Sequence, residues 1–199
     1  YSMFNRLEYR YFKDIIKSDL LNKLSVSFVV EEKKRFFGGC AGNIAYSMGL
    51  LKTKAYICGL LGNDGWVYKN AIEKWGINTK YLLIENNHSP LAFITTDLDQ
   101  NQIAHFAPGV IGSNAKKFDL PKEATSGDIL LVSPENHDRM LSAIKQGHKK
   151  GLKVYFDPGQ QIHSFSKEEI VFVLKMSSAL FVNTYEWELL KKISGLNKK

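Results

Sequence analysis

The second half of the chain alternates between short apolar runs and amphipathic stretches, and this alternation restricts the possible fold more than any other feature. The apolar runs have the length of buried strands, and the stretches between them show helical periodicity. In chain order the expected elements are strand 129–133, helix 137–150, strand 152–157, helix 166–176, strand 179–183 and helix 185–193. Ser166 and Glu169 have the spacing of a capping box at the start of one helix. Strands joined by helices through short connections predict a parallel sheet that is covered by helices.

Strands of another kind are expected in the first half of the chain. Apolar and polar residues alternate over 24–30, which is typical of a half-buried strand, and the strand continues through charged residues to Gly38 and Gly39. Two further β-rich runs, 91–96 and 102–106, flank a polar loop and predict a hairpin. Because strands buried on both faces lack alternation, we expect a second, smaller β layer that stands off the main sheet.

Two helices and one strand complete the expected pattern of this half. A helix over 41–51 starts directly after the glycines, a strand is expected over 53–59, and a second helix over 65–75. The apolar face of the second helix is expected to consist of Val67, Ala71, Ile72 and Trp75. Residues 1–20 are polar and aromatic without a clear period, so no element is predicted there.

Composition bounds the class of protein. The 199 residues are 44% apolar and 24% charged, which is ordinary for a globular chain and enough for one domain with a substantial core. No apolar run approaches the roughly 20 residues of a membrane span, charged residues interrupt the first stretch, and the two cysteines lack a metal-ligand spacing. We therefore expect a cytoplasmic protein without a membrane partner. The net charge of +7 comes from scattered lysines without an interleaved aromatic stripe, so no nucleic-acid partner is expected.

The most specific segment is 38–45, Gly-Gly-Cys-Ala-Gly-Asn-Ile-Ala, where an expected strand meets an expected helix. Glycines let the backbone approach a ligand closely, and the helix start offers unpaired N–H groups. Asn43 can donate and accept at once, which suits a pair of sugar hydroxyls. The segment is neither a Walker phosphate loop nor a dinucleotide fingerprint, which disfavours an oxidoreductase with a nicotinamide cofactor. A plain tight turn with packing glycines remains an equal alternative.

The order of these residues resembles the first signature of the PfkB/ribokinase family. The matching positions are Gly38, Gly39, Ala41, Asn43, Ala45, Gly62, Asn63, Asp64, Gly65, Gly76 and Ile77. Four later segments are also similar to family motifs: Thr95-Thr96-Asp97, Phe106-Ala107-Pro108-Gly109, Phe156-Asp157-Pro158-Gly159 and Asn183-Thr184-Tyr185-Glu186. The first two of these resemble a bacterial subgroup that is adenosine kinase-like.

The resemblance implies a fold and an activity. The fold would be a single ribokinase-like α/β domain over residues 1–199, in three layers (α/β/α) with a mainly parallel sheet. A small β-sheet lid would be formed by residues of about 22–37 and 91–107 and would exclude water from the acceptor. The activity would be phosphorylation of a small sugar or an adenosine-like nucleoside, with ATP and Mg²⁺ as cofactors. The resemblance also allows a homodimer formed through the lid.

Site residues follow from the resemblance position by position. Gly38, Gly39 and Asn43 would hold the acceptor's hydroxyls, with Ser2 beside them. Phe106, or Phe93, would stack on a base or sugar face, or would only pack within the lid.

On the phosphate side, Asn183 and Glu186 would organise Mg²⁺ and phosphate through water, so no direct metal ligand is expected. Glu186 would otherwise be a polar residue in the first turn of a helix. Asp157 would contact the phosphate or metal region, or would only cap the turn before Pro158.

The chain departs from the family pattern at three places. Ser2 stands where the family has an aspartate, and a hydroxyl cannot supply the same charge-assisted hydrogen bond. Lys52 replaces a small residue, which is expected to alter a turn. The family's Gly-Ala-Gly-Asp motif, with its general base and anion hole, is expected beyond residue 199, and the strand before Ser2 is expected to be absent. The C-terminal part of the fold would then be missing, and the alternative function is an inactive, truncated relative that at most binds the acceptor, with no catalytic residue of its own.

Overall fold

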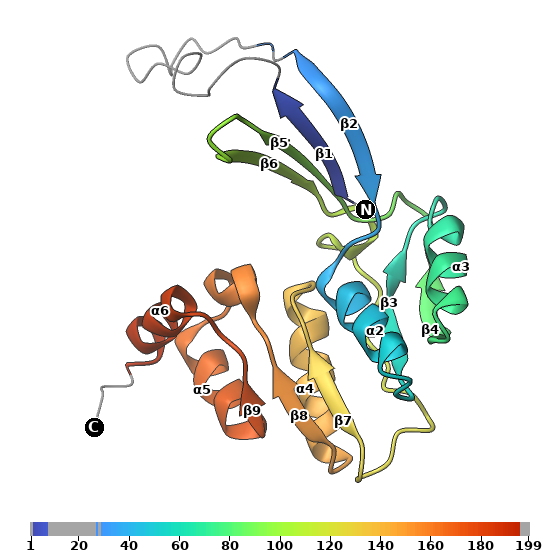
Figure 1. The fold of residues 1–199 in the computed structure, drawn as a ribbon. Helices are drawn as coiled ribbons and strands as arrows, with labels where there is room; N and C mark the ends of the chain where they lie inside the picture. Colours follow the sequence, from blue (N-terminus) through green and yellow to red (C-terminus); the bar gives the residue numbers. More distant parts are fainter. Residues whose placement is uncertain (1, 8–26, 28, 196–199) are drawn as a thin grey trace. The chain divides into compact units, whose positions relative to one another are not determined.

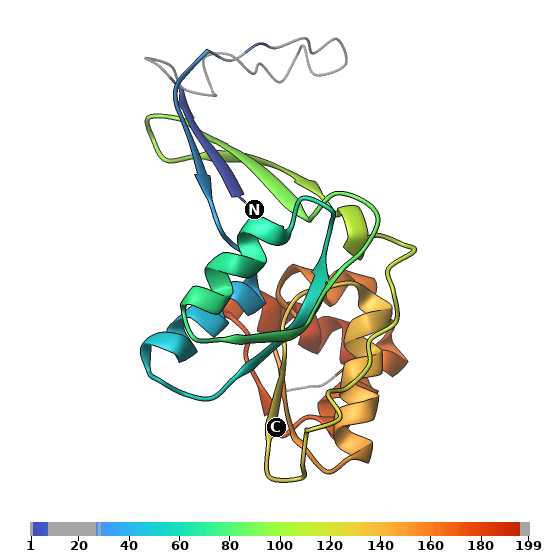
Figure 2. The same ribbon diagram turned by 90° about the vertical axis from the view of Figure 1, so that its right-hand side faces the viewer.

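The structure is a computed structural model that describes residues 2–7, 27 and 29–195. The chain divides into two compact units, unit 1 (Tyr1–Val110) and unit 2 (Ile111–Lys199). Figures 1 and 2 show that each unit combines strands with helices. In the part of the chain that the structure describes, no helix is long and apolar enough to cross a membrane.

Within the described residues of unit 1, four strands form one sheet in the order β2-β1-β5-β6, here called the four-stranded sheet. Its strands are β2 (Val30–Phe36), β1 (Ser2–Leu7), β5 (Leu91–Thr96) and β6 (Gln102–Ala107). The predicted hairpin is confirmed, because β5 and β6 pair antiparallel, whereas β1 and β5 run parallel. The strand β1 had not been predicted, because residues 1–20 show no clear period. Of the strand predicted over 24–30, residues 24–26 and 28 lie outside the described residues.

A second, smaller sheet of unit 1 is made by β3 (Tyr56–Leu61) and β4 (Asn78–Ile84), which pair in parallel among the described residues. Two helices, α2 (Cys40–Leu50) and α3 (Trp66–Lys74), accompany these strands, and α3 is the crossover between them. One buried apolar cluster joins the four elements, and its members are Ala45, Ile57, Leu61, Tyr68, Ile72, Ile77 and Leu82. The strand β4 had not been predicted.

The buried face of α3 differs from the predicted one. Val67 is 64% exposed, whereas Tyr68 and Ile72 are buried. The face is rotated toward Tyr68 because its hydroxyl donates a hydrogen bond of 2.9 Å to the Gly38 carbonyl. A polar tip that finds a partner lets a tyrosine enter the core.

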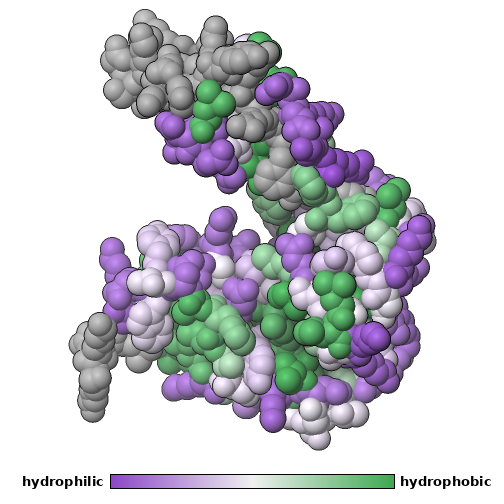
Figure 3. All heavy atoms as spheres, in the orientation of Figure 1, coloured by the Kyte–Doolittle hydropathy of each residue, from purple (hydrophilic) through white to green (hydrophobic). Residues whose placement is uncertain are grey.

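In the described part of unit 2, three strands form a parallel sheet in chain order, which confirms the predicted arrangement. The elements are β7 (Ile129–Val132), α4 (His137–Lys149), β8 (Lys153–Phe156), the short 3₁₀ helix η3 (Gly159–Ser164), α5 (Lys167–Met176), β9 (Ala179–Leu180) and α6 (Thr184–Ser194). Another 3₁₀ helix, η2 (Gly109–Ile111), spans the boundary between the two units along the chain. Gly147 of α4 faces Leu130 and Val154, so α4 covers one face of this sheet. Ile129 and Leu131 are exposed on the other face, and Figure 3 shows apolar side chains gathered over these strands.

The predicted capping box of α5 is also confirmed. The Ser166 hydroxyl accepts a hydrogen bond from the Glu169 backbone at 3.2 Å, and the Glu169 carboxylate accepts one from the Ser166 backbone at 2.8 Å. Both bonds satisfy N–H groups that would otherwise lack partners at the start of the helix. Helix α5 therefore begins where the sequence predicted it.

Candidate functional site

Residues 37–39, which connect β2 to α2, and the first residues of α2 form a largely exposed turn, which we call the glycine turn (residues 37–43). Gly39 has a φ of +91°, a conformation that glycine adopts without steric cost. The Gly39 carbonyl accepts a hydrogen bond of 2.9 Å from the backbone of Asn43, and this bond closes the first turn of α2. The side chains of Cys40 and Asn43 are exposed, so the turn presents the beginning of α2 to solvent.

The glycine turn rests on a side chain that sequence reasoning missed. Besides the hydrogen bond from its hydroxyl to Gly38, Tyr68 packs its ring edge-on against Phe37, with 5.4 Å between the ring centroids. Gly42 lies so close to Tyr68 that an added Cβ would fall 1.8 Å from the hydroxyl oxygen. Gly42, the third glycine of the motif, therefore leaves room for Tyr68. The presence of a glycine at this position was the one feature of the sequence that indicated a close neighbour.

The register of the four-stranded sheet brings two predicted site residues into one cross-strand row. Ser2 pairs with Phe36 on one side and with Ala92 on the other, and Ala92 pairs with Phe106. Phe36 and Phe106 are 48% and 60% exposed, and Phe36 had not been predicted. Phe93 pairs with His105 in the next row and so lies on the opposite face from Phe106.

The motif Asn63-Asp64-Gly65 anchors the loop that leads from β4 into β5. The backbone of Ser89 donates a hydrogen bond of 2.8 Å to Asp64, and the Ser89 hydroxyl accepts one of 2.9 Å from the backbone of Gly62. Burial opposes ionisation of Asp64, but the hydrogen bonds from Ser89 bring the pKa of its carboxyl below the usual 3.8. In the same region the Asn63 amide donates to the side chain of Asn86 at 2.9 Å. The loop that enters the four-stranded sheet at β5 is therefore held by hydrogen bonds to the residues that follow β3.

The remaining predicted site residues belong to unit 2, where they follow the carboxyl ends of β8 and β9. Asp157 comes directly after β8, and Asn183 and Glu186 form a second capping box at the start of α6. The Asn183 side chain accepts from the Glu186 backbone at 2.9 Å, and Glu186 Oε2 accepts from the Asn183 backbone at 2.9 Å. Glu186 thus lies in the first turn of a helix, the position expected if its role is only structural. The hydrogen bond from the Asn183 backbone fixes the orientation of its carboxylate.

Asp157 and Glu186 lie close enough to influence each other. Burial raises the pKa of Asp157, the negative charge of Glu186 raises it further, and the Gly159 backbone N–H partly opposes both. Among the described residues no group of three or more His, Cys, Asp or Glu side chains could hold a metal ion. Two neighbouring carboxylates nevertheless fit Mg²⁺, because this ion keeps most of its waters and needs few protein ligands.

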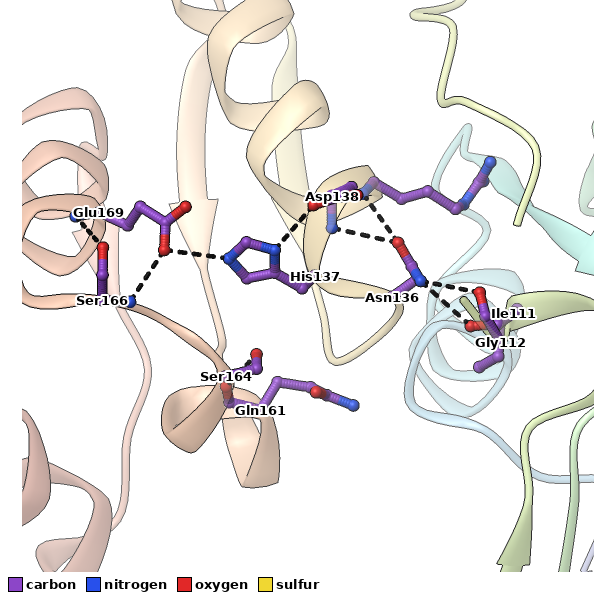
Figure 4. Close-up of polar contacts among 10 residues, drawn as sticks. Ile111, Gly112, Asn136, His137, Asp138, Gln161, Ser164, Ser166 and Glu169 are labelled. Carbon is purple, nitrogen blue, oxygen red and sulfur yellow. Dashed lines mark hydrogen bonds and ion pairs between the residues drawn. The ribbon is translucent and has the colours of Figure 1, made fainter. Parts of the chain in front are cut away.

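A polar network lies at the starts of α4 and α5 (Figure 4). The Asn136 side chain accepts from the backbones of Asp138 and Arg139 and donates to the Gly112 carbonyl at 3.0 Å. His137 contacts two carboxylates, with 2.9 Å from Nδ1 to Asp138 and 3.2 Å from Nε2 to Glu169. Through these contacts His137 joins two helices of unit 2, α4 and α5, which is a structural role.

Parallel strands with carboxylates after their carboxyl ends, a glycine turn before a helix, and a four-stranded sheet in unit 1 fit a ribokinase-like α/β fold. The sequence model of the pfkB family of carbohydrate kinases matches residues 14–198. The chain therefore belongs to this family.

Solved structures and curated relatives agree with this assignment. A nucleoside kinase of Burkholderia thailandensis, solved in complex with inosine, is 30% identical, with a TM-score of 0.81 over 99% of this chain and 62% of that one. The same kinase in complex with ADP-inosine gives a TM-score of 0.77. A nucleoside kinase of Methanocaldococcus jannaschii is 28% identical over 167 residues, which are 82% of this chain and 54% of the relative. The chain spans about half the length of the curated relatives that it matches.

Proposed function

We propose that this chain carries the acceptor site of an ATP-dependent nucleoside kinase. The observation that carries the proposal is the exposed glycine turn, with Asn43 in the first turn of α2. Relatives of this chain are nucleoside kinases, and one of them was solved with inosine, which supports a nucleoside as the acceptor.

The chemistry of the turn suits a ribose. The Asn43 amide can donate to one hydroxyl and accept from its neighbour, and the N–H groups at the start of α2 can donate to hydroxyl oxygens. Phe36 and Phe106 offer exposed rings on the same face of the four-stranded sheet. Aromatic faces suit a planar base better than a simple sugar, which favours a nucleoside. The predicted lid segments, 22–37 and 91–107, would then cover the acceptor and exclude water.

The phosphate side of the reaction is assigned to Asp157, Asn183 and Glu186. Asp157 and Glu186 would hold Mg²⁺ through its waters, and the ion, when bound with ATP, would neutralise charge on the transferred phosphoryl group. Asp157 follows the carboxyl end of a parallel strand, where open α/β sheets bind ligands. The sequence Gly-Ala-Gly-Asp does not occur among the 199 residues, and no general base is assigned within them.

Calorimetric titration tests the acceptor site. Inosine and adenosine are expected to bind saturably, and ribose and fructose 6-phosphate more weakly or not at all. Asn43→Ala is expected to weaken nucleoside binding about tenfold or more, because two hydrogen bonds are lost. Asn70→Ala, on the exposed side of α3, is the matched control and should change nothing. No binding by the wild type, or equal binding by Asn43→Ala, would refute the proposed acceptor site.

A phosphoryl-transfer assay with ATP, Mg²⁺ and the nucleoside separates the two hypotheses about activity. Turnover above background by residues 1–199 would rule out the inactive alternative. Binding without turnover would assign acceptor binding, and not catalysis, to these residues.

A further inference from the structure

Three parts of the glycine turn meet at one buried side chain of α3. Tyr68 is 7% exposed, and its hydroxyl donates a hydrogen bond of 2.9 Å to the Gly38 carbonyl. Its ring packs edge-on against Phe37, and its hydroxyl lies against the bare Cα of Gly42. The glycine turn thus packs on Tyr68, a residue 30 positions away from Gly38 in the sequence.

The two carbonyl groups of the glycine pair are both engaged within the protein. The Gly38 carbonyl accepts from Tyr68, and the Gly39 carbonyl accepts from the backbone of Asn43. Glycines have no side chain that would restrict their own conformation, so the orientation of these two peptides depends on such hydrogen bonds. The bond from Tyr68 is the one of the two that does not come from the helix itself.

We infer that Tyr68 is a positioning residue, whose hydroxyl holds the glycine turn in the conformation that receives the nucleoside's hydroxyls. This inference rests on the proposed function. The hydroxyl fixes the Gly38–Gly39 peptide before the ligand arrives, so less ordering remains to be done on binding. Gly42 belongs to the same device, because any Cβ at this position would displace the hydroxyl.

The competing interpretation is that Tyr68 only fills the core. It belongs to the apolar cluster with Ile72, and its ring alone would serve that purpose. The two interpretations differ in what the hydroxyl does. Under core filling, removal of the hydroxyl lowers stability and leaves nucleoside affinity and the motion of the turn unchanged.

Tyr68→Phe tests the inference, since it removes the hydroxyl and keeps the ring. The Kd for inosine is expected to rise roughly 3- to 10-fold, the range that one hydrogen bond provides. Amide hydrogen exchange in a peptide covering residues 37–43 is expected to speed up in the absence of ligand. Tyr46→Phe removes the same group from a half-exposed ring of α2 that packs on Trp75, and it should change neither quantity.

A second variant makes the test independent of the first. Gly42→Ala puts a Cβ 1.8 Å from the Tyr68 hydroxyl oxygen but 3.1 Å from the ring carbon that carries it. The substitution is therefore expected to weaken nucleoside binding in the wild type and to cost much less in the Tyr68→Phe background. Such non-additivity marks two residues that act through one contact.

The outcomes separate the inference from the function on which it rests. An unchanged Kd and unchanged exchange in Tyr68→Phe, with only a lower melting temperature, would overturn the inference and leave the proposed function intact. Additive effects of the two substitutions would overturn it as well. If the wild type binds no nucleoside, the proposed function fails. Whether the hydroxyl holds the turn is then still decided by two measurements. These are hydrogen exchange over residues 37–43 and the free energies of unfolding of Tyr68→Phe, Gly42→Ala and the double variant.

Discussion

Lys52 has the left-handed backbone conformation that usually belongs to glycine, with a φ of +54°. It follows the C-cap of α2, and Gly76 and Gly151 occupy the corresponding positions after α3 and α4, with φ of +78° and +80°. A residue with a Cβ loses about 1 kcal/mol or more in this conformation. The departure from the family pattern at Lys52 therefore lies in a turn, as expected, and raises the conformational cost of that turn.

Lys52→Gly is expected to raise the free energy of unfolding by up to about 1 kcal/mol. The gain from the relaxed backbone is reduced by the greater freedom of glycine in the unfolded chain. Urea unfolding at constant pH measures the change. Lys54→Gly is the control, because Lys54 has no positive φ and its replacement should destabilise the protein slightly. A loss of stability in Lys52→Gly would show that the Lys52 side chain contributes more than its backbone costs.

Asp157→Asn is expected to raise the melting temperature at pH 7, by about 1–3 °C. Burial raises the pKa of Asp157 in the folded state above 3.8, so the folded protein holds the proton more tightly than the unfolded chain. The contribution of Asp157 to stability therefore falls as pH rises through the raised pKa, and it stays unfavourable above it. Asparagine removes the charge and can still accept the hydrogen bond from Gly159.

Thermal unfolding at several pH values checks this prediction. The gain in Asp157→Asn should shrink as the pH is lowered toward 3.8, where the aspartate is increasingly protonated in both states. In the proposed function the carboxylate is kept for Mg²⁺, so Mg²⁺ alone should raise the melting temperature of the wild type and not of Asp157→Asn. A melting temperature at pH 7 that is unchanged or lower would contradict the sign derived from the pKa.

At the scale of elements, the sequence predicted best what depends on neighbours along the chain. The helices α2, α4, α5 and α6 begin within one residue of the predicted starts, because apolar periodicity and caps are local signals. The strand β1 had no such signal, since it becomes a strand only by pairing with β2 and β5. The strand β4, which begins Asn78-Thr79-Lys80, is likewise defined by its pairing with β3.

The residues of the candidate site likewise fall into those marked by local sequence and those placed by contacts between distant residues. Gly38, Gly39 and Asn43 could be predicted, because a motif of adjacent residues marks them. Tyr68 and Phe36 could not be predicted, because their places depend on a contact across 30 residues and on the register of three strands. Gly42 was the one local sign of the contact with Tyr68. It lies inside α2, where no turn requires a glycine, and a side chain there would collide with the Tyr68 hydroxyl.

Glu169→Gln is expected to lower the melting temperature at pH 7 by about 1–3 °C, through weaker capping of α5. The Ser166 backbone hydrogen bond lowers the pKa of Glu169 below 4.5, with help from His137. The stabilisation is therefore present above pH 4.5 and is lost as pH falls through the lowered pKa. Glu168→Gln removes a charge from the same turn without the capping bond and should cost less. A difference from the wild type that persists far below pH 4.5 would contradict this origin.

At the scale of the whole molecule, the proposed acceptor residues and the proposed phosphate residues are built separately. Gly38, Gly39, Asn43 and Phe106 belong to unit 1, and Asp157, Asn183 and Glu186 to unit 2. Each group is fixed by contacts within its own unit, the glycine turn by Tyr68 and Glu186 by Asn183. We therefore expect binding of the proposed acceptor to depend on the contacts of unit 1 and to be insensitive to loss of a carboxylate in unit 2.

Hydrogen exchange with mass spectrometry tests this division. A nucleoside at 100 times its Kd stabilises the bound region by about 2.7 kcal/mol, which slows exchange through opening roughly 100-fold. This protection is expected in peptides covering 37–50 and 91–107, and not in 153–160 or 181–194. Asn43→Ala should abolish it, whereas Asp157→Asn should leave it unchanged. Protection of the unit 2 peptides by nucleoside alone, or its loss in Asp157→Asn, would show that the acceptor site draws on both units.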